Sequence, residues 1–204
     1  MRLGIYGGSF DPIHHGHLLL AECARDRMKL DRVEFVPLGV PPHCKQVRTP
    51  GEDRYNMTLR AIAPYPEFAV NRCELDSNEI SYTVDTLRFY RRQYPDDELF
   101  LIVSSETFND IPNWRAPDEL CELVSLIVAR RGGYPPPDFD SYLAFTTPER
   151  VEELKRGVID IPAIELSSTD VRERVAAGES VRFLTPDSVI DYIRDKRLYL
   201  KNRR

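Results

Sequence analysis

The sequence predicts an α/β fold with a mostly parallel sheet and helices on both of its faces. Short apolar runs, typical of buried strands, alternate along the chain with segments of helical periodicity. One run, Leu99–Val103, is apolar throughout, as expected of a central parallel strand that is covered on both faces. With 204 residues the chain can bury a sizeable core, so we expect a single domain over residues 1–204 with a helical portion from about residue 166.

The first elements follow from residues 3–36. An apolar run at 3–6 predicts a strand, and apolar residues at 18, 20, 21, 24 and 28 have helical spacing. Asp31 and Arg32 interrupt this pattern, and residues 33–36 form a second apolar run. We therefore expect strand, helix and strand in that order.

The later elements repeat the alternation. A helix is expected at 52–63, where Pro64 stops it, and a third strand at 68–70 that continues through Leu75. Thr83 is the expected cap of a helix that has Asp85 and Thr86 in its first turn and runs through Leu87 to Tyr94. Strands are then expected at 99–103, 126–129 and 158–161. A short helix is expected to close at 120–123, a second to run up to Ala177 and a third to extend from Pro186 to Tyr199. Residues 135–147 have no clear pattern.

Composition and charge exclude several classes of protein. Hydrophobic residues make up 42% of the chain and charged residues 30%, as in soluble globular proteins. The net charge of −5 offers no general attraction for nucleic acid, so a phosphate ligand requires local positive groups. Because no apolar run approaches about 20 residues and no signal peptide is recognisable, we expect a cytoplasmic protein without a membrane segment. The 4 cysteines lack a C-x-x-C pair, which favours free thiols.

The segment between the first strand and the first helix carries the strongest chemical signal. Glycines let a ligand lie against the backbone and allow positive φ, and the following helix start offers unpaired N–H groups to an anion. His14 and His17 share a face of the first helical turn, where imidazoles can donate to oxygens that gain charge in phosphoryl or nucleotidyl transfer. The segment reads Gly7-Gly8-Ser9-Phe10-Asp11-Pro12-Ile13-His14-His15-Gly16-His17.

Two alternatives for the histidines stay open: a surface cluster and a metal pair. No further carboxylate or cysteine follows on that helix at ligand spacing, which weakens the metal alternative.

A second motif, residues 166–172, reads Leu-Ser-Ser-Thr-Asp-Val-Arg. Ser167 or Ser168 can cap the next helix, and Arg172 lies one turn further on, so open amides and a guanidinium can hold one polyphosphate. The alternative is a capped helix with an arginine in solvent. Between the two motifs, a loop at 37–51 contains basic residues, and Trp114 stands between two prolines, where it can stack on a flat ring.

The long first motif resembles the signature of the nucleotidylyltransferase superfamily, and its G-G-S-F-D-P-x-H-x-G-H form is similar to bacterial nicotinate-nucleotide adenylyltransferases. The resemblance implies a Rossmann-like nucleotidylyltransferase fold. It also implies adenylyl transfer from ATP, with Mg²⁺ on the ATP, to nicotinate mononucleotide, which gives deamido-NAD and pyrophosphate in NAD synthesis. No G-x-G-x-x-G or Walker motif supports hydride transfer or Walker-type hydrolysis.

The resemblance also implies roles for individual residues. His14, His17 and Arg172 would stabilise the transferring and leaving phosphates, and no metal site made of protein side chains is expected. The residues implied to bind ATP are Gly7, Gly8, Ser9, Phe10, His14, His17, Glu106, Ser167, Ser168, Thr169 and Arg172. Those implied to bind the nicotinate nucleotide are Ser9, Phe10, Lys45, Tyr82, Thr83, Thr86 and Trp114.

The sequence departs from the family pattern at two places. Ser104 and Glu106 stand where the family has G-x-D, which predicts altered nucleotide binding. Cys44 stands where the family has a phosphate-binding basic residue, and Lys45 follows one position later.

Alternatives to this function stay open as well. The acceptor could be nicotinamide mononucleotide, phosphopantetheine or, with CTP, an alcohol phosphate, and the protein could be a non-catalytic nucleotide sensor. A helix N-terminus at Thr83 favours an acid over a neutral amide. The basic tail from Lys196 is expected either to be solvated or to contact a neighbouring subunit in a homo-oligomer.

Overall fold

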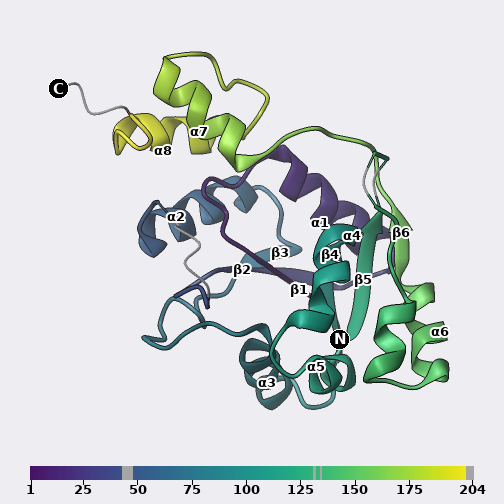
Figure 1. Ribbon diagram of the computed structural model, residues 1–204. Helices are drawn as coiled ribbons and strands as arrows, with labels where there is room; N and C mark the ends of the chain where they lie inside the picture. The colour runs from purple at the N-terminus through teal and green to yellow at the C-terminus, as the bar shows by residue number, and fades with distance from the viewer. Residues whose placement is uncertain (43–47, 131, 134, 201–204) are drawn as a thin grey trace.

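A six-stranded, fully parallel sheet forms the centre of the protein in the computed structural model, which describes residues 1–42, 48–130, 132–133 and 135–200. The strand order is β3-β2-β1-β4-β5-β6 (Figure 1). The predicted α/β class is therefore confirmed. The strands are β1 (Arg2–Gly8), β2 (Arg32–Pro37), β3 (Phe68–Val70), β4 (Glu98–Ser104), β5 (Ser125–Arg130) and β6 (Val158–Asp160).

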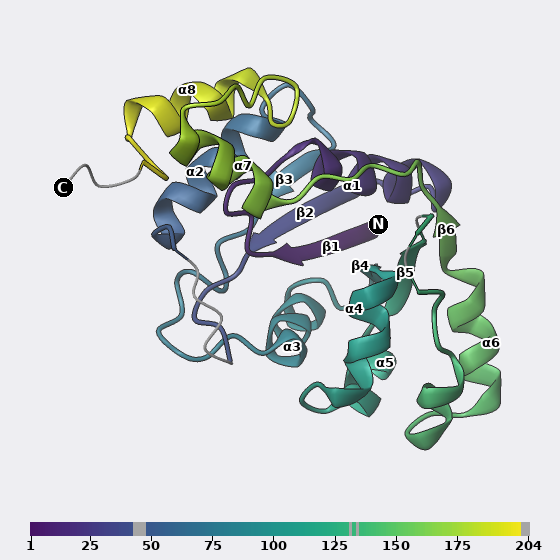
Figure 2. The ribbon, with the colours of Figure 1, turned by 45° about the horizontal axis from the view of Figure 1, so that its top comes forward.

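Helices cover both faces of this sheet, as predicted (Figure 2). Side chains from α1, α2 and α8 join one apolar cluster, and side chains from α3, α4, α5 and α6 join the cluster on the other face. The helices are α1 (His15–Arg27), α2 (Gly51–Ile62), α3 (Thr83–Gln93), α4 (Ser105–Asp110), α5 (Pro117–Leu123), α6 (Pro148–Arg156), α7 (Ser168–Ala177) and α8 (Asp187–Asp195), with short 3₁₀ turns η1 (Ile111–Asn113) and η2 (Asp140–Ala144).

Most differences from the sequence predictions lie at helix ends. The cap predicted at Thr83 is wrong, because Tyr82 is the N-cap of α3 and Thr83 is its first residue. The third strand ends at Val70 rather than at Leu75, and α8 ends at Asp195 rather than at Tyr199.

Two helices, α4 and α6, were not predicted. Each begins at a side-chain cap: Ser104 Oγ accepts from the Thr107 N–H at 3.3 Å, and Thr147 Oγ1 accepts from the Arg150 N–H at 3.3 Å.

Two further expectations concern membranes and thiols. Across the described ranges, no helix is both long and apolar enough to cross a bilayer. Cys23, Cys73 and Cys121 are free thiols, as predicted, and Cys44 lies outside the described residues. Burial raises the pKa of Cys121 to about 11, so this thiol stays protonated at neutral pH.

The contact of α6 with the sheet generates a stability prediction at Gly157. A Cβ atom added there would lie 2.0 Å from the carbonyl oxygen of Leu126, and backbone atoms cannot move aside cheaply. We expect Gly157→Ala to lower the free energy of unfolding by about 1–3 kcal/mol in urea titrations. Gly132→Ala is the matched control, because its Cβ would meet nothing within 4 Å. Equal stability of the two variants would contradict the close contact.

Candidate active site

A cleft of about 750 Å³ opens where β1 and β4 end. From β1 the chain builds the sheet outward to β2 and β3 and then crosses to β4 on the other side, so β1 and β4 flank the topological switch point. Ligands of doubly wound folds bind at the carboxyl ends of strands at this point. The cleft is lined by the loop after β1, the start of α3, the end of β4 with α4, and Trp114.

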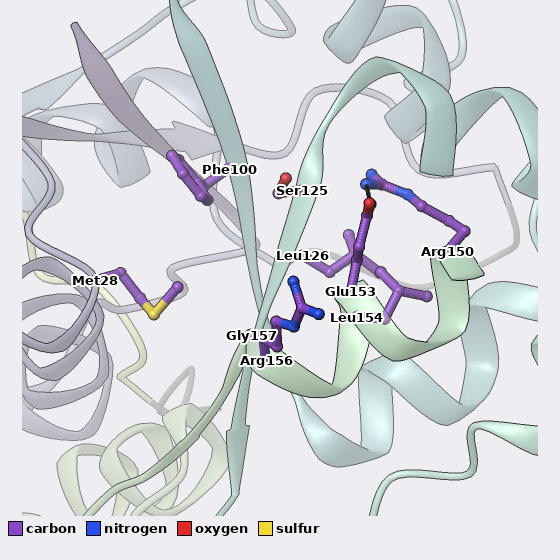
Figure 3. Close-up of a pocket in the computed structure, with 9 residues that line it drawn as sticks. All are labelled: Met28, Phe100, Ser125, Leu126, Arg150, Glu153, Leu154, Arg156 and Gly157. Carbon is purple, nitrogen blue, oxygen red and sulfur yellow. Dashed lines mark hydrogen bonds and ion pairs between the residues drawn. The ribbon is translucent and has the colours of Figure 1, made fainter. Parts of the chain in front are cut away.

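A second, smaller hollow of about 230 Å³ lies near the amino-terminal ends of β4 and β5 (Figure 3). Its Arg150 donates to the carbonyl oxygens of Cys121 and Val124 and pairs with Glu153 at 2.6 Å. The guanidinium is thus used within the protein, and we place the chemistry in the large cleft.

The loop that joins β1 to α1, residues 9–14, is fixed by hydrogen bonds that its carbonyl groups accept. Four of them accept hydrogen bonds from side chains that lie far away in the sequence, on α2, on α7 and just before α8. An irregular loop can keep buried carbonyls only if they find such partners. The bonds are Arg54 Nη1 to Ser9 at 2.8 Å, Arg172 Nη1 to Asp11 at 2.6 Å, Ser168 Oγ to Pro12 at 2.8 Å and Thr185 Oγ1 to Ile13 at 2.7 Å.

Neither glycine before this loop has a positive φ, so what matters is the room that the absence of a side chain leaves. Gly7 and Gly8 belong to β1, and the positive φ of the loop, +47°, is at the buried Phe10. A Cβ on Gly7 would meet nothing within 4 Å, so its place beside the cleft is open, whereas a Cβ on Gly8 would lie 2.8 Å from the Phe10 ring. The Phe10 ring accounts for the glycine at position 8, and the approach of a ligand to Gly7 stays a prediction.

The two histidines lie together as the spacing predicted. His14 is the N-cap of α1, and its ring stacks on that of His17 with centroids 3.6 Å apart. The backbone N–H of His14 donates to His17 Nδ1 at 3.2 Å, so the proton of a neutral His17 ring sits on Nε2. A Cβ on Gly16 would lie 3.0 Å from His14 Nδ1, so Gly16 makes room for this ring rather than for a ligand.

The second motif begins α7 and contacts the loop. Ser167 caps the helix, since its Oγ accepts from the Asp170 N–H at 3.1 Å, while the Ser168 hydroxyl is bonded to Pro12. Arg172 donates to Asp11 and, through Nη2, to Thr169 Oγ1 at 3.0 Å. The structure thus brings the two sequence motifs together, although more than 150 residues separate Asp11 from Arg172.

The opposite wall of the cleft contains the residues expected at the acceptor. Thr86 on α3 donates through Oγ1 to Glu74 Oε1 at 2.7 Å. The Trp114 indole N–H donates to Asp110 Oδ2 at 2.9 Å, which fixes the plane of the ring beside the cleft. Arg115 lies over the Tyr82 ring, 4.6 Å from its centroid. An aromatic ring and the first turn of a helix therefore share this end of the cleft.

The backbone at Ser104 does not require glycine. Its φ is −78°, a value open to any residue, and its hydroxyl caps α4. Glu106 follows in the first turn of α4 and lines the cleft.

The predicted site residues divide into three groups. Those that line the cleft are Gly7, Gly8, Ser9, Phe10, His17, Tyr82, Thr83, Thr86, Glu106 and Trp114. His14, Ser168 and Arg172 contact the loop or His17 directly, and Ser167 and Thr169 belong to the same turn of α7. Lys45 lies outside the described residues. The role of each residue stays a prediction.

Sequence reasoning missed Arg54 and Glu74. Arg54 on α2 is 2% exposed and also donates to the carbonyl of Leu38 at 2.5 Å, so it joins the segments that follow β1 and β2. Burial lowers its pKa, and the nearby Asp11 carboxylate opposes this shift. Burial raises the pKa of Glu74, although Thr86 and the Gly39 N–H donate to it.

A signal for Arg54 was present in the sequence. A charged residue occupies the helical face that also carries the buried Met57 and Ala61. For Glu74 we find no comparable signal.

Comparison with known proteins agrees with this geometry. Residues 5–174 match the cytidylyltransferase-like family. Over 201 residues the chain is 43% identical to a probable nicotinate-nucleotide adenylyltransferase of Thermus thermophilus, covering 98% of this chain and 100% of the relative. A relative of the same description from Desulfitobacterium hafniense is 41% identical, with coverage of 97% and 95%.

Solved structures support the fold. Plasmodium falciparum nicotinic acid mononucleotide adenylyltransferase complexed with NaAD superposes with a TM-score of 0.73 at 20% identity, over 97% of both chains. The same enzyme complexed with APC gives a TM-score of 0.70 at 21% identity, over 97% of this chain and 96% of the other. Sequence and fold together show that the chain belongs to the nicotinate-nucleotide adenylyltransferases, nucleotidyltransferases within the cytidylyltransferase-like family.

Proposed function

We propose that the chain transfers the adenylyl group of ATP to nicotinate mononucleotide and releases deamido-NAD and pyrophosphate. The observation that carries the proposal is the joining of the two phosphate motifs through Arg172 and Ser168, next to a cleft whose far wall is the start of α3 and Trp114. A polyphosphate and a flat, acidic ring can therefore be held side by side.

The reaction needs alignment more than acid–base chemistry. The acceptor phosphate attacks the α-phosphorus of ATP in line, and pyrophosphate leaves. A phosphate monoester is already nucleophilic at neutral pH, so the protein has to orient two polyanions and stabilise their charge. His17 fits this task, because its ring lines the cleft and its Nδ1 accepts from the backbone, so a neutral ring carries its proton on Nε2. Arg172 adds a positive charge beside the loop, and the His14 ring stacks on that of His17.

In the proposed reaction Mg²⁺ would arrive bound to ATP rather than to protein side chains. The described residues contain no group of three or more His, Cys, Asp or Glu side chains that could hold a metal. Mg²⁺ commonly binds through substrate phosphates and waters rather than in an all-protein cage. When bound, Mg²⁺ would neutralise charge on the triphosphate. The loop 9–14 and α7 would orient the triphosphate.

The start of α3 favours nicotinate over nicotinamide. Tyr82, Thr83 and Thr86 line the cleft where the positive end of this helix lies, and a carboxylate is stabilised there more than a neutral amide. The amide nucleotide is the second candidate acceptor. We also propose that residues 1–204 act as one domain, since α8 packs on α2 and α7 holds the loop. The cytoplasmic location and the subunit contact of the basic tail stay predictions.

Replacement of His17 tests the phosphate site. We expect His17→Ala to reduce turnover about 10²–10⁴-fold, because a donor to the transferring phosphate is lost. The measurement is pyrophosphate release with saturating ATP and nicotinate mononucleotide. His15→Ala is the control, since that side chain does not line the cleft. A loss of less than tenfold in a folded His17 variant would remove His17 from the mechanism.

A comparison of the two acceptor nucleotides tests whether the start of α3 selects the acid. In the same assay we expect kcat/KM for nicotinate mononucleotide to exceed that for nicotinamide mononucleotide about 5- to 30-fold, the range that a helix N-terminus can supply. Equal values, or a preference for the amide, would show that α3 does not select the acid. ATP binding without turnover of either mononucleotide would favour a nucleotide sensor.

Removal of divalent metal tests whether the reaction requires Mg²⁺ on the ATP. With excess EDTA we expect pyrophosphate release to fall at least about a hundredfold, and added Mg²⁺ to restore it. Full activity in EDTA would show that the protein's own cations suffice.

A further inference from the structure

The carboxylate of Asp11 joins two segments that the proposed reaction has to align. Asp11 lies in the loop 9–14 and is 3% exposed. Its Oδ1 accepts from the Tyr199 hydroxyl at 2.7 Å, and its Oδ2 accepts from the backbone N–H of Arg48 at 3.1 Å. A buried carboxylate beside a polyphosphate site is unfavourable unless both oxygens are satisfied, and here they are.

Tyr199 reaches this carboxylate from the last described residues of the chain. After α8 ends, Arg197 and Tyr199 adopt left-handed φ values of +54° and +62°, which non-glycine residues adopt only where the surroundings hold them. The half-buried side chain packs against the apolar cluster formed by α1, α2 and α8. Burial raises the pKa of Tyr199, so its hydroxyl is protonated at neutral pH and can donate.

Arg48 belongs to the loop at 37–51, of which residues 43–47 lie outside the described residues. Its amide is bonded to Asp11, and the next residue, Thr49, gives its carbonyl to Arg54 Nε at 3.2 Å. Arg54 in turn holds Ser9. The loop 9–14 is thus joined to residues 48–49 at two points, through the Asp11 carboxylate and through Arg54. Tyr199 contacts the first of these points.

We propose that Tyr199 is a positioning residue: by orienting the Asp11 carboxylate it sets the loop 9–14 and the segment Arg48–Thr49 at the separation that transfer between two phosphates requires. This inference rests on the proposed function, because only a reaction with a second phosphate substrate makes that separation matter. Tyr199 acts through Asp11 and need not touch substrate. Its hydroxyl also satisfies one oxygen of this buried carboxylate, which would be costly to leave unpaired.

The chain offers a matched pair of variants. Tyr199→Phe removes the bond to Asp11, and Tyr192→Phe removes a similar bond, from Tyr192 on α8 to Asp53 Oδ1 at 2.8 Å, which does not involve the loop 9–14. We expect kcat/KM for nicotinate mononucleotide to fall about three- to tenfold in Tyr199→Phe, the effect of one hydrogen bond, and mainly through a higher KM. Tyr192→Phe should lose thermal stability to a similar extent and keep its kinetic constants.

Hydrogen exchange gives a readout that does not depend on activity. In Tyr199→Phe we expect faster exchange in peptides that cover residues 9–15 and 48–50, and in Tyr192→Phe we expect no change there. A chain that ends at Leu198 should behave like Tyr199→Phe, whereas one that ends at Leu200 should behave like the full chain.

The outcomes are distinguishable. Wild-type kinetics and exchange in Tyr199→Phe would overturn the inference, as would equal kinetic losses in the two phenylalanine variants, because Tyr199 would then be only structural. If the full chain turns over no mononucleotide, the proposed function fails. Exchange at residues 9–15 and 48–50 still decides whether Tyr199 orders the two loops.

Discussion

The irregular loop 9–14 needs hydrogen-bond partners for its carbonyl groups, and the rest of the structure depends on how this protein supplies them. The carbonyls of Ser9, Asp11, Pro12 and Ile13 are taken by two guanidinium groups and two hydroxyls from other parts of the chain. Each bond to a charged donor is stronger than a neutral one, and leaving a buried carbonyl unpaired would be costly. Helices α2 and α7 and the segment before α8 are therefore part of the site without lining its cleft.

This constraint explains why residues from distant parts of the sequence meet. Arg172 was expected at the triphosphate, and the structure shows it donating to the backbone of the loop that carries the histidines. A guanidinium has five N–H groups, so holding Asp11 and Thr169 leaves donors for a phosphate. Ser168 has only one proton, and it is used on Pro12. The serine therefore contributes by fixing α7 against the loop.

The sheet and the histidine pair could be predicted because local patterns determine them. Continuous apolar runs marked buried parallel strands, and a spacing of three residues put His14 and His17 on one helical face. The partners of the loop carbonyls could not be predicted, because a hydrogen bond from Arg54 to Ser9 depends on how α2 packs. The same holds for Glu74, which meets Thr86 only after the segment following β3 folds against α3.

The charge balance around Asp11 resolves an apparent conflict between an acidic protein and polyanionic substrates. The chain carries a net charge of −5, yet two guanidinium groups meet at the loop: Arg54 donates to the Ser9 carbonyl and interacts with the Asp11 carboxylate, and Arg172 donates to the Asp11 carbonyl. Keeping Arg54 charged in a buried place costs free energy, as its lowered pKa indicates. Because burial also reduces screening, this positive charge acts more strongly on a nearby phosphate than a surface lysine would. The Asp11 carboxylate offsets part of this cost, so Arg54 can stay charged while it holds the carbonyl groups of Ser9 and Leu38.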